Sequence, residues 1–243
     1  MRKLFLLSLL LFSFTNCSKD HAFDCLKSTG DEITENRHTD NFNKLNLHDN
    51  VDIILYSDTT PFVIVTAGEH LINGIITEVD NHTLYIRNEN RCNWTRSFKN
   101  KFTVKVGMRN PEHIEIYDSG DITCADTIRT ENFLFDSWNA SGSFHLLFNN
   151  EKSYINNSTG RPDFHAAGKT NVVLAYMNDI ATLDFSELKT ELFYITSSTT
   201  GDCKINVDKE LQAKLTYTGD VYYTGSLYKV DQEVSGSGRL IRY

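Results

Sequence analysis

A short turn signature recurs through the second half of the chain, and this repeat constrains the fold more than any other feature of the sequence. Seven glycine or asparagine residues each precede a short apolar stretch: Gly120, Gly142, Gly160, Asn178, Gly201, Gly219 and Gly238. Six steps separate the first from the last, so one repeat takes about 20 residues. Glycine and asparagine enter the left-handed backbone region at low cost, so their recurrence predicts a recurring turn. A period of this length, with strands and no helical pattern, predicts an all-β solenoid.

The residue two positions after each turn is apolar in nearly every repeat: Ile122, Phe144, Pro162, Ile180, Cys203, Val221 and Leu240. Side chains on a strand alternate between its two faces, so this set is predicted to form one interior column. Phe164 is expected to supply the apolar group where Pro162 interrupts the column. Each coil of a solenoid buries its apolar face only by stacking on its neighbours, so we expect one continuous core along the stack.

Residues 42–108 are less regular than the repeat. Five apolar segments there indicate strands: residues 45–47, 51–55, 62–65, 83–86 and 102–106. Between them, apolar residues from Leu71 to Val79 recur at helical spacing, and Glu69 lies in the first turn. We expect one short helix here that covers the end of the stack, since the ends of a solenoid must be shielded.

The N-terminus has the pattern of an export signal. Arg2 and Lys3 precede an apolar run over residues 4–14, which is too short to span a bilayer because a span needs roughly 20 residues. Cys17 resembles the lipobox cysteine of bacterial lipoproteins, whose thiol is acylated, as by palmitate, before cleavage leaves it as the mature N-terminus. The alternative is an ordinary secretory signal followed by a chance cysteine.

These features predict a lipoprotein signal peptide over residues 1–16, a lipid-anchored tether over 17–41 and a solenoid domain over 42–243. The predicted location is the cell envelope, with the lipid held in the outer membrane and the choice between its periplasmic and outward sides left open. The formal net charge of −8 disfavours nucleic acid as a partner, which needs a positive surface. No cofactor or metal is expected, since the eight histidines contain no pair at metal-ligand spacing. The oligomeric state is not indicated.

The closing repeats carry a family resemblance. They comprise Val207–Ala213, Gly219–Gly225 and Ser235–Gly238. With the strand-rich N-terminal third, they make the chain similar, over about residues 42–240, to the head GIN domain family of putative auto-transporter adhesins. The resemblance implies a right-handed parallel β-helix, an exported or lipid-anchored protein and an adhesin-like role. It implies no catalytic residue.

Two surface features are candidate sites. If the coils are in register, Asp179, Asp202 and Asp220 form a ladder with a spacing of about 4.8 Å, which could hold a cation such as calcium; the alternative is that these aspartates bond to turn amides. Aromatic residues in the last coils could stack on sugars or on a partner, although strand propensity also explains them. This candidate patch comprises Tyr217, Tyr222, Tyr223 and Tyr228.

The cysteines can be sorted by their place in the repeat. Cys124 and Cys203 share the inward face but lie four coils apart, about 19 Å, which is too far for a disulfide. They are predicted to be buried free thiols. Cys25 and Cys92 remain as the pair that can form a disulfide, which would tie the segment after the anchor to the loop at 88–100.

The function that these features favour is a non-catalytic, lipid-anchored binding module that presents a rigid lateral surface to a glycan or protein partner. One alternative is a polysaccharide-processing enzyme on a β-helix scaffold, which would need a cleft with converging carboxylates. The other is a structural spacer without a ligand.

Overall fold

The structure is a computed structural model that describes residues 28–57, 60–91 and 101–243. Nearly all of its regular structure is β. Its strands are β1 (Glu32–Arg37), β2 (Lys44–Leu47), β3 (Asp52–Ser57), β4 (Phe62–Gly68), β5 (Ile75–Asp80), β6 (Thr83–Asn88), β7 (Thr103–Met108), β8 (His113–Tyr117), β9 (Ile122–Cys124), β10 (Asn132–Trp138), β11 (Ser143–Asn157), β12 (Asp163–Asp179), β13 (Thr182–Thr199), β14 (Cys203–Leu215), β15 (Val221–Thr224), β16 (Lys229–Val234) and β17 (Leu240–Arg242). Within the described part of the chain, no helix is long and apolar enough to cross a membrane.

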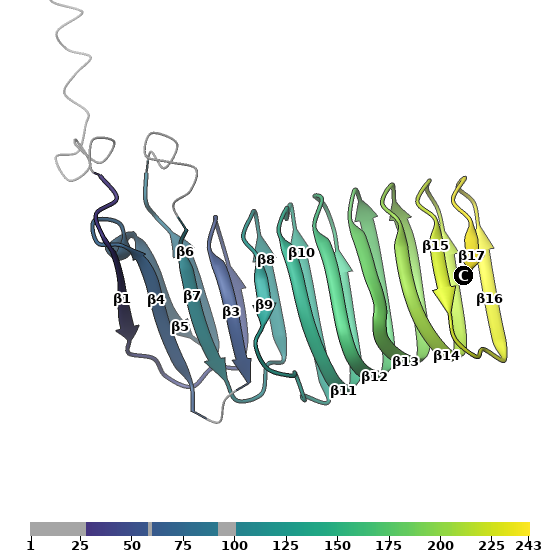
Figure 1. Cartoon of the computed structure of the whole chain (residues 1–243), viewed down its shortest axis with the longest axis horizontal. Coiled ribbons are helices and arrows are strands. Elements are labelled where there is room, and N and C mark those ends of the chain that lie inside the picture. The colour runs from purple at the N-terminus through teal and green to yellow at the C-terminus, as the bar shows by residue number, and fades with distance from the viewer. Residues whose placement is uncertain (1–27, 58–59, 92–100) are drawn as a thin grey trace, which may run out of the picture.

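The strands form a two-faced solenoid whose coils stack along the long axis of the molecule (Figure 1). One face, the A face, contains β3, β9, β15, β17 and the first halves of β11 to β14. The other, the B face, contains β2, β8, β10, β16 and the second halves of β11 to β14. All of these strands pair in parallel. The predicted β-solenoid with about 20 residues per coil is confirmed.

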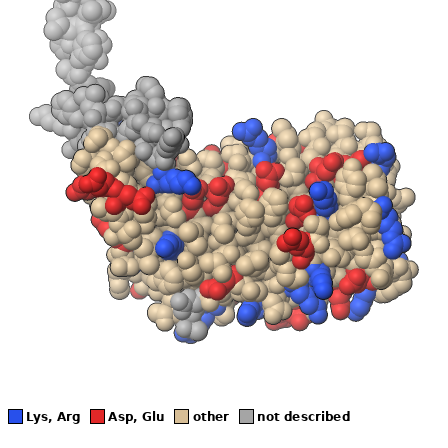
Figure 2. All heavy atoms as spheres, viewed as in Figure 1, with Lys and Arg blue, Asp and Glu red and all other residues tan. Residues whose placement is uncertain are grey.

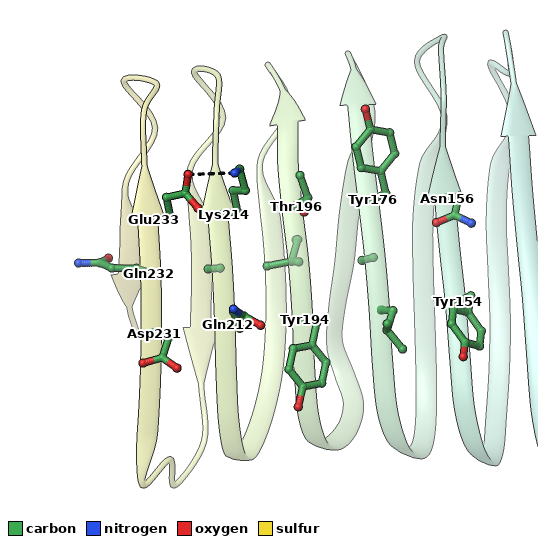
Figure 3. Close-up of a pocket in the computed structure, with 14 residues that line it drawn as sticks. Tyr154, Asn156, Tyr176, Tyr194, Thr196, Gln212, Lys214, Asp231, Gln232 and Glu233 are labelled. Atoms are coloured by element: carbon green, nitrogen blue, oxygen red, sulfur yellow. Dashed lines mark hydrogen bonds and ion pairs between the residues drawn. The ribbon is translucent and has the colours of Figure 1, made fainter.

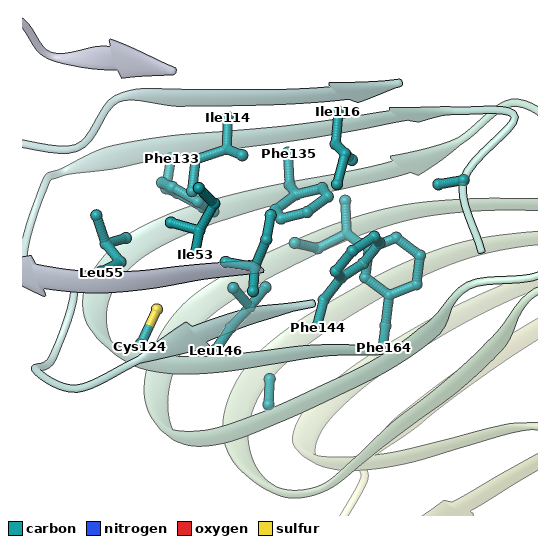
Figure 4. Packing of buried hydrophobic residues seen from close by; sticks show 14 of the residues in the cluster. Ile53, Leu55, Ile114, Ile116, Cys124, Phe133, Phe135, Phe144, Leu146 and Phe164 are labelled. Carbon is teal, nitrogen blue, oxygen red and sulfur yellow. The ribbon is translucent and has the colours of Figure 1, made fainter. Parts of the chain in front are cut away.

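The core lies between the two faces and is rich in phenylalanine. Phe135, Phe144 and Phe164 are fully buried, and their ring centroids lie 4.9 to 5.4 Å apart (Figure 4). Such tilted and edge-to-face pairs are favoured by the ring quadrupoles. Phe164 pairs with Phe144 in register, so it fills the interior position that Pro162 interrupts, as predicted.

The interior column differs from the prediction in one coil. Leu183 pairs with both Phe164 and Cys203 and is 1% exposed, whereas Ile180, the predicted member, is 54% exposed. The turn residue of this coil is Asp179, with φ of 65°, and not Asn178. Aspartate also tolerates the left-handed region, so the turn moves one residue along the chain. Ile180 is therefore placed on the outside.

The N-terminal coils are interleaved in a way that the sequence does not indicate. β2 lies between β6 and β8, and β3 lies between β7 and β9. Residues 44–57 therefore separate two coils that follow them in sequence. The strands predicted at 45–47, 51–55, 62–65, 83–86 and 102–106 are all present.

The predicted short helix in this region is wrong. Only the three residues Ile72–Gly74 are helical, as a single 3-10 turn, and Ile75–Asp80 forms β5. β5 pairs antiparallel with β6 through a two-residue loop in which Asn81 and His82 have φ of 46° and 61°. Hairpin loops of this length favour positive φ at both positions, which asparagine provides at low cost. A hairpin, and not a helix, lies at this end of the stack.

The predicted tether also contributes to the sheet. Residues 32–37, inside the segment assigned to the tether, form β1 and pair antiparallel with β4. The ordered domain therefore begins before residue 42. β1, β4 and β5 pair only in the antiparallel direction and therefore lie outside the parallel coils at this end.

Candidate binding face

The outward side chains of the B face form two long columns because the parallel strands are in register. The first column comprises Leu134, Tyr154, Leu174, Tyr194, Gln212 and Asp231. The second comprises Asp136, Asn156, Tyr176, Thr196, Lys214 and Glu233. Neighbouring members of a column are separated by one strand spacing, about 4.8 Å.

A groove of about 490 Å³ lies across these columns, which we call the B-face groove. Tyr154 and Tyr194 extend toward one edge of the face, and Tyr176, which is 42% exposed, extends toward the opposite edge (Figure 3). The side chain of Leu174 lines the groove with them. The three rings therefore alternate about the axis of the stack, one on each of three successive coils.

The charged groups in and beside the groove are paired. The Lys214 ammonium lies 2.9 Å from the Glu233 carboxylate (Figure 3). At the other end, Asp136 accepts hydrogen bonds of 2.9 Å from both His113 and Asn156. Burial raises the pKa of Asp136, but these hydrogen bonds outweigh it and hold the pKa below its ordinary value. On the broad face seen in Figure 2, acidic and basic side chains are interspersed.

A second aromatic group lies farther toward the N-terminal coils on the B face. The Tyr117 ring stacks on the His48 ring at 4.5 Å, and the Tyr117 hydroxyl donates to Glu115 over 2.7 Å. This bond to a carboxylate, together with burial, raises the pKa of Tyr117 to about 12. Asn46 also donates to Glu115, over 2.6 Å. These groups bond to one another across the neighbouring strands β2 and β8 and so stabilise the stack.

The predicted aspartate ladder is not formed as expected. Asp202 and Asp220 lie in one column, and the Asp220 amide donates to the Asp202 carboxylate over 3.0 Å. Asp179 occupies the turn position itself, where it accepts from the Gly160 amide over 2.8 Å. Asp121 likewise accepts from the amide of Ser143 in the next coil. The aspartates therefore bond to turn amides, and within the described residues no group of three or more His, Cys, Asp or Glu could hold a metal ion.

The predicted tyrosine patch is divided between different parts of the surface. Tyr217 follows β14 and Tyr228 precedes β16, so they lie at turns on opposite edges of the solenoid. Tyr223 points inward and packs against the core, while Tyr222 points outward on the A face. These four residues do not make one surface.

The A face carries a smaller groove of about 330 Å³. The rings of His145 and His165 stack there at 4.8 Å, and Asp184 lies beside them in the next coil. Lys204 lies 3.6 Å from Asp184. This groove holds two imidazoles and a paired carboxylate and contains no tyrosine.

The cysteines in the described part of the chain behave as predicted. Cys124 and Cys203 are buried free thiols. Burial raises the pKa of Cys124 to about 11 and that of Cys203 to about 12, so both stay protonated at neutral pH. Cys17, Cys25 and Cys92 lie outside the described residues, and the lipidation and the disulfide pairing remain predictions.

The sequence analysis did not identify the B-face tyrosines as a site. The signal for them is the repeat itself, because Tyr154, Leu174 and Tyr194 follow one another at steps of 20 residues. The register pairs confirm that equal steps place these residues side by side.

The two-faced parallel stack defines the class of this protein, a β-solenoid of the parallel β-helix type. Crystal structures with this fold include a putative adhesin from Bacteroides fragilis, with a TM-score of 0.82, 17% identity and coverage of 89% of this chain and 100% of that chain. A putative adhesin from Parabacteroides merdae has a TM-score of 0.65 and 15% identity, with coverage of 89% and 98%. A putative lipid binding protein from Parabacteroides distasonis has a TM-score of 0.64 and 15% identity, with coverage of 89% and 99%.

The chain belongs to the family described as "Putative auto-transporter adhesin, head GIN domain", which matches residues 41–226. No curated protein matches it significantly. The family resemblance predicted from the repeats is thus confirmed.

Proposed function

We propose that the protein is a non-catalytic binding module of the cell envelope, anchored by a lipid on Cys17, that engages a macromolecule through the B-face groove. The observation that carries this proposal is the set of three tyrosines that one groove presents on successive coils of the sheet. Partly exposed aromatic rings are the side chains most enriched at binding surfaces, and here the sheet holds them in fixed positions. Membership of an adhesin-like family supports both the binding role and an exported location.

The turn aspartates give the enzyme alternative no support. Asp121, Asp202 and Asp220 accept hydrogen bonds from backbone amides of the next coil. A hydrolase or lyase needs a carboxylate that faces a substrate cleft together with a second acid or base. The aromatic groove favours binding over both catalysis and a purely structural spacer.

The binding role can be tested with beads that carry the chain from Ser18 onward, which includes every described residue. We expect these beads to adhere to at least one of three coated surfaces: mucin, fibronectin or hydroxyethyl cellulose. The triple variant Tyr154→Thr, Tyr176→Thr and Tyr194→Thr should abolish adhesion while retaining strand-compatible side chains. A matched control is the double variant Tyr217→Thr and Tyr228→Thr, which removes exposed tyrosines outside the groove. Adhesion that survives the triple variant, or no adhesion to any of the surfaces, would contradict the proposal.

The anchor is tested separately by Cys17→Ser in the full chain. A lipid-anchored protein partitions into the membrane fraction because each buried methylene contributes about 0.8 kcal/mol. The variant should move to the soluble fraction. Continued retention in the membrane would refute the lipid mechanism.

A further inference from the structure

We infer that the ligand of the B-face groove is an extended, uncharged polysaccharide that lies along the axis of the stack, across Tyr154, Tyr176 and Tyr194. This inference rests on the proposed function of the groove as the binding site and adds the class of ligand. Three properties of the groove support it: its periodicity, its hydrogen-bonding groups and its charge.

The groove repeats along its length. Tyr154 and Tyr194 are two coils apart, roughly 10 Å, and Tyr176 lies on the coil between them, two residues farther along its strand than Leu174. Two strand spacings are close to the length of a disaccharide in an extended chain of pyranose units. A ligand that repeats at this interval meets equivalent rings at Tyr154 and Tyr194, whereas a folded protein surface has no such period.

The groove also has the mixed chemistry that a sugar requires. A pyranose presents apolar C–H groups on its faces and hydroxyls at its edges. The tyrosine rings and Leu174 offer apolar surface, while Thr196 and Gln212 lie beside them as neutral polar groups. Neither Thr196 nor Gln212 makes a side-chain hydrogen bond to another residue of the described chain, so both are available to ligand hydroxyls.

The charge of the groove disfavours a polyanion. Its lysine, Lys214, is already paired with Glu233. Asp231 adds a further carboxylate to the lining and is paired with Lys229 over 2.9 Å, within a chain of net charge −8. Lys152 lies at the edge of the groove, with its ammonium 5.8 Å from the centre of the Tyr154 ring. Because Lys214 and Lys229 are already paired with carboxylates, a sulfated or uronic-acid polymer would meet little unpaired positive charge, so an uncharged polymer fits better.

The experiment is affinity gel electrophoresis of the chain from Ser18 onward in gels that contain hydroxyethyl cellulose, glucomannan or heparin. We expect at least one of the two uncharged polymers to retard the protein, and heparin not to. Tyr194→Thr should weaken binding by about tenfold or more, whereas Tyr194→Phe, which keeps the ring, should stay within about threefold. The control Tyr217→Thr with Tyr228→Thr should bind as the unaltered chain does. Equal urea midpoints would establish that the variants are folded.

Ligand length gives an independent readout. The column from Tyr154 to Asp231 spans four strand spacings, roughly 19 Å, so a six-unit cello-oligosaccharide should bind at least about tenfold tighter than a two-unit one in calorimetry. The inference is overturned if neither uncharged polymer retards the protein, if heparin retards it more strongly, or if the control loses binding equally. If adhesion of the beads to fibronectin alone still depends on the B-face tyrosines, the polysaccharide inference fails and the proposed function stands. If adhesion is also absent, both fail.

Discussion

The register of the coil around residue 180 leads to a sharp prediction about stability. Ile180 and Leu183 are aliphatic side chains of equal size in the same coil, and only the structure distinguishes them: Leu183 is 1% exposed and Ile180 is 54% exposed. Replacing Leu183 with alanine removes three buried carbons, which costs about 2.4 kcal/mol of transfer free energy. The cavity left between Phe164 and Cys203 adds to this, so we expect a total loss of about 2–5 kcal/mol in the free energy of unfolding. Ile180→Ala should change the free energy of unfolding by less than about 0.5 kcal/mol.

The measurement is urea unfolding of the chain from Ser18 onward, followed by circular dichroism and by tryptophan fluorescence. Repeat proteins can unfold in more than one step, so the free energies are compared only if the two transitions coincide. The matched pair controls for the loss of the same number of carbons. A loss from Ile180→Ala as large as that from Leu183→Ala would refute the register, and the interior column would then follow the turn at Asn178.

Three further predictions concern the thiols, acid stability and the turns. Cys124 and Cys203 should fail to react with a thiol reagent at pH 8 in the folded protein and should react fully in urea, because burial raises their pKa values to about 11 and about 12. Peptide mapping that finds Cys124 or Cys203 rapidly labelled in the folded chain would contradict this. The pKa of Asp136 is lowered in the folded state, so its ionised form stabilises the fold at pH values above its unfolded pKa of about 4, and this contribution is lost as the pH falls through the folded pKa. The difference in unfolding free energy between the unaltered chain and Asp136→Asn should therefore shrink below about pH 4. A difference that grew below this pH would contradict the direction of the shift. Gly160→Ala should destabilise by more than about 1 kcal/mol in the same urea assay, because φ is 102° and the new Cβ would lie 2.1 Å from a backbone oxygen of the preceding coil; an unchanged midpoint would contradict the turn geometry.

The groove illustrates why a site of this kind is hard to recognise in a sequence. Tyr154, Tyr176 and Tyr194 are spread over 40 residues, and each is unremarkable within its own strand. The tyrosines near the C-terminus form an apparent cluster because they are close in sequence. Tyr217 and Tyr228 nevertheless lie at opposite edges of the solenoid, since a coil of about 20 residues returns to the same edge only after one full period.

The sequence by itself determined the features of this protein that are local or periodic. Alternation along each strand and a turn at every coil specify an all-β solenoid. Phe164 could be assigned to the core despite Pro162, because the direction of a side chain depends only on its position along the strand. Only the tertiary structure decided which segments are neighbours. It inserted residues 44–57 between coils that follow them, formed a hairpin where the spacing of Leu71 to Val79 suggested a helix, and moved a turn to Asp179 so that Ile180 faces solvent. The physical reason is that strand pairing and burial are made between residues far apart in the chain, so their free energy can override a local preference of a fraction of a kcal/mol per residue.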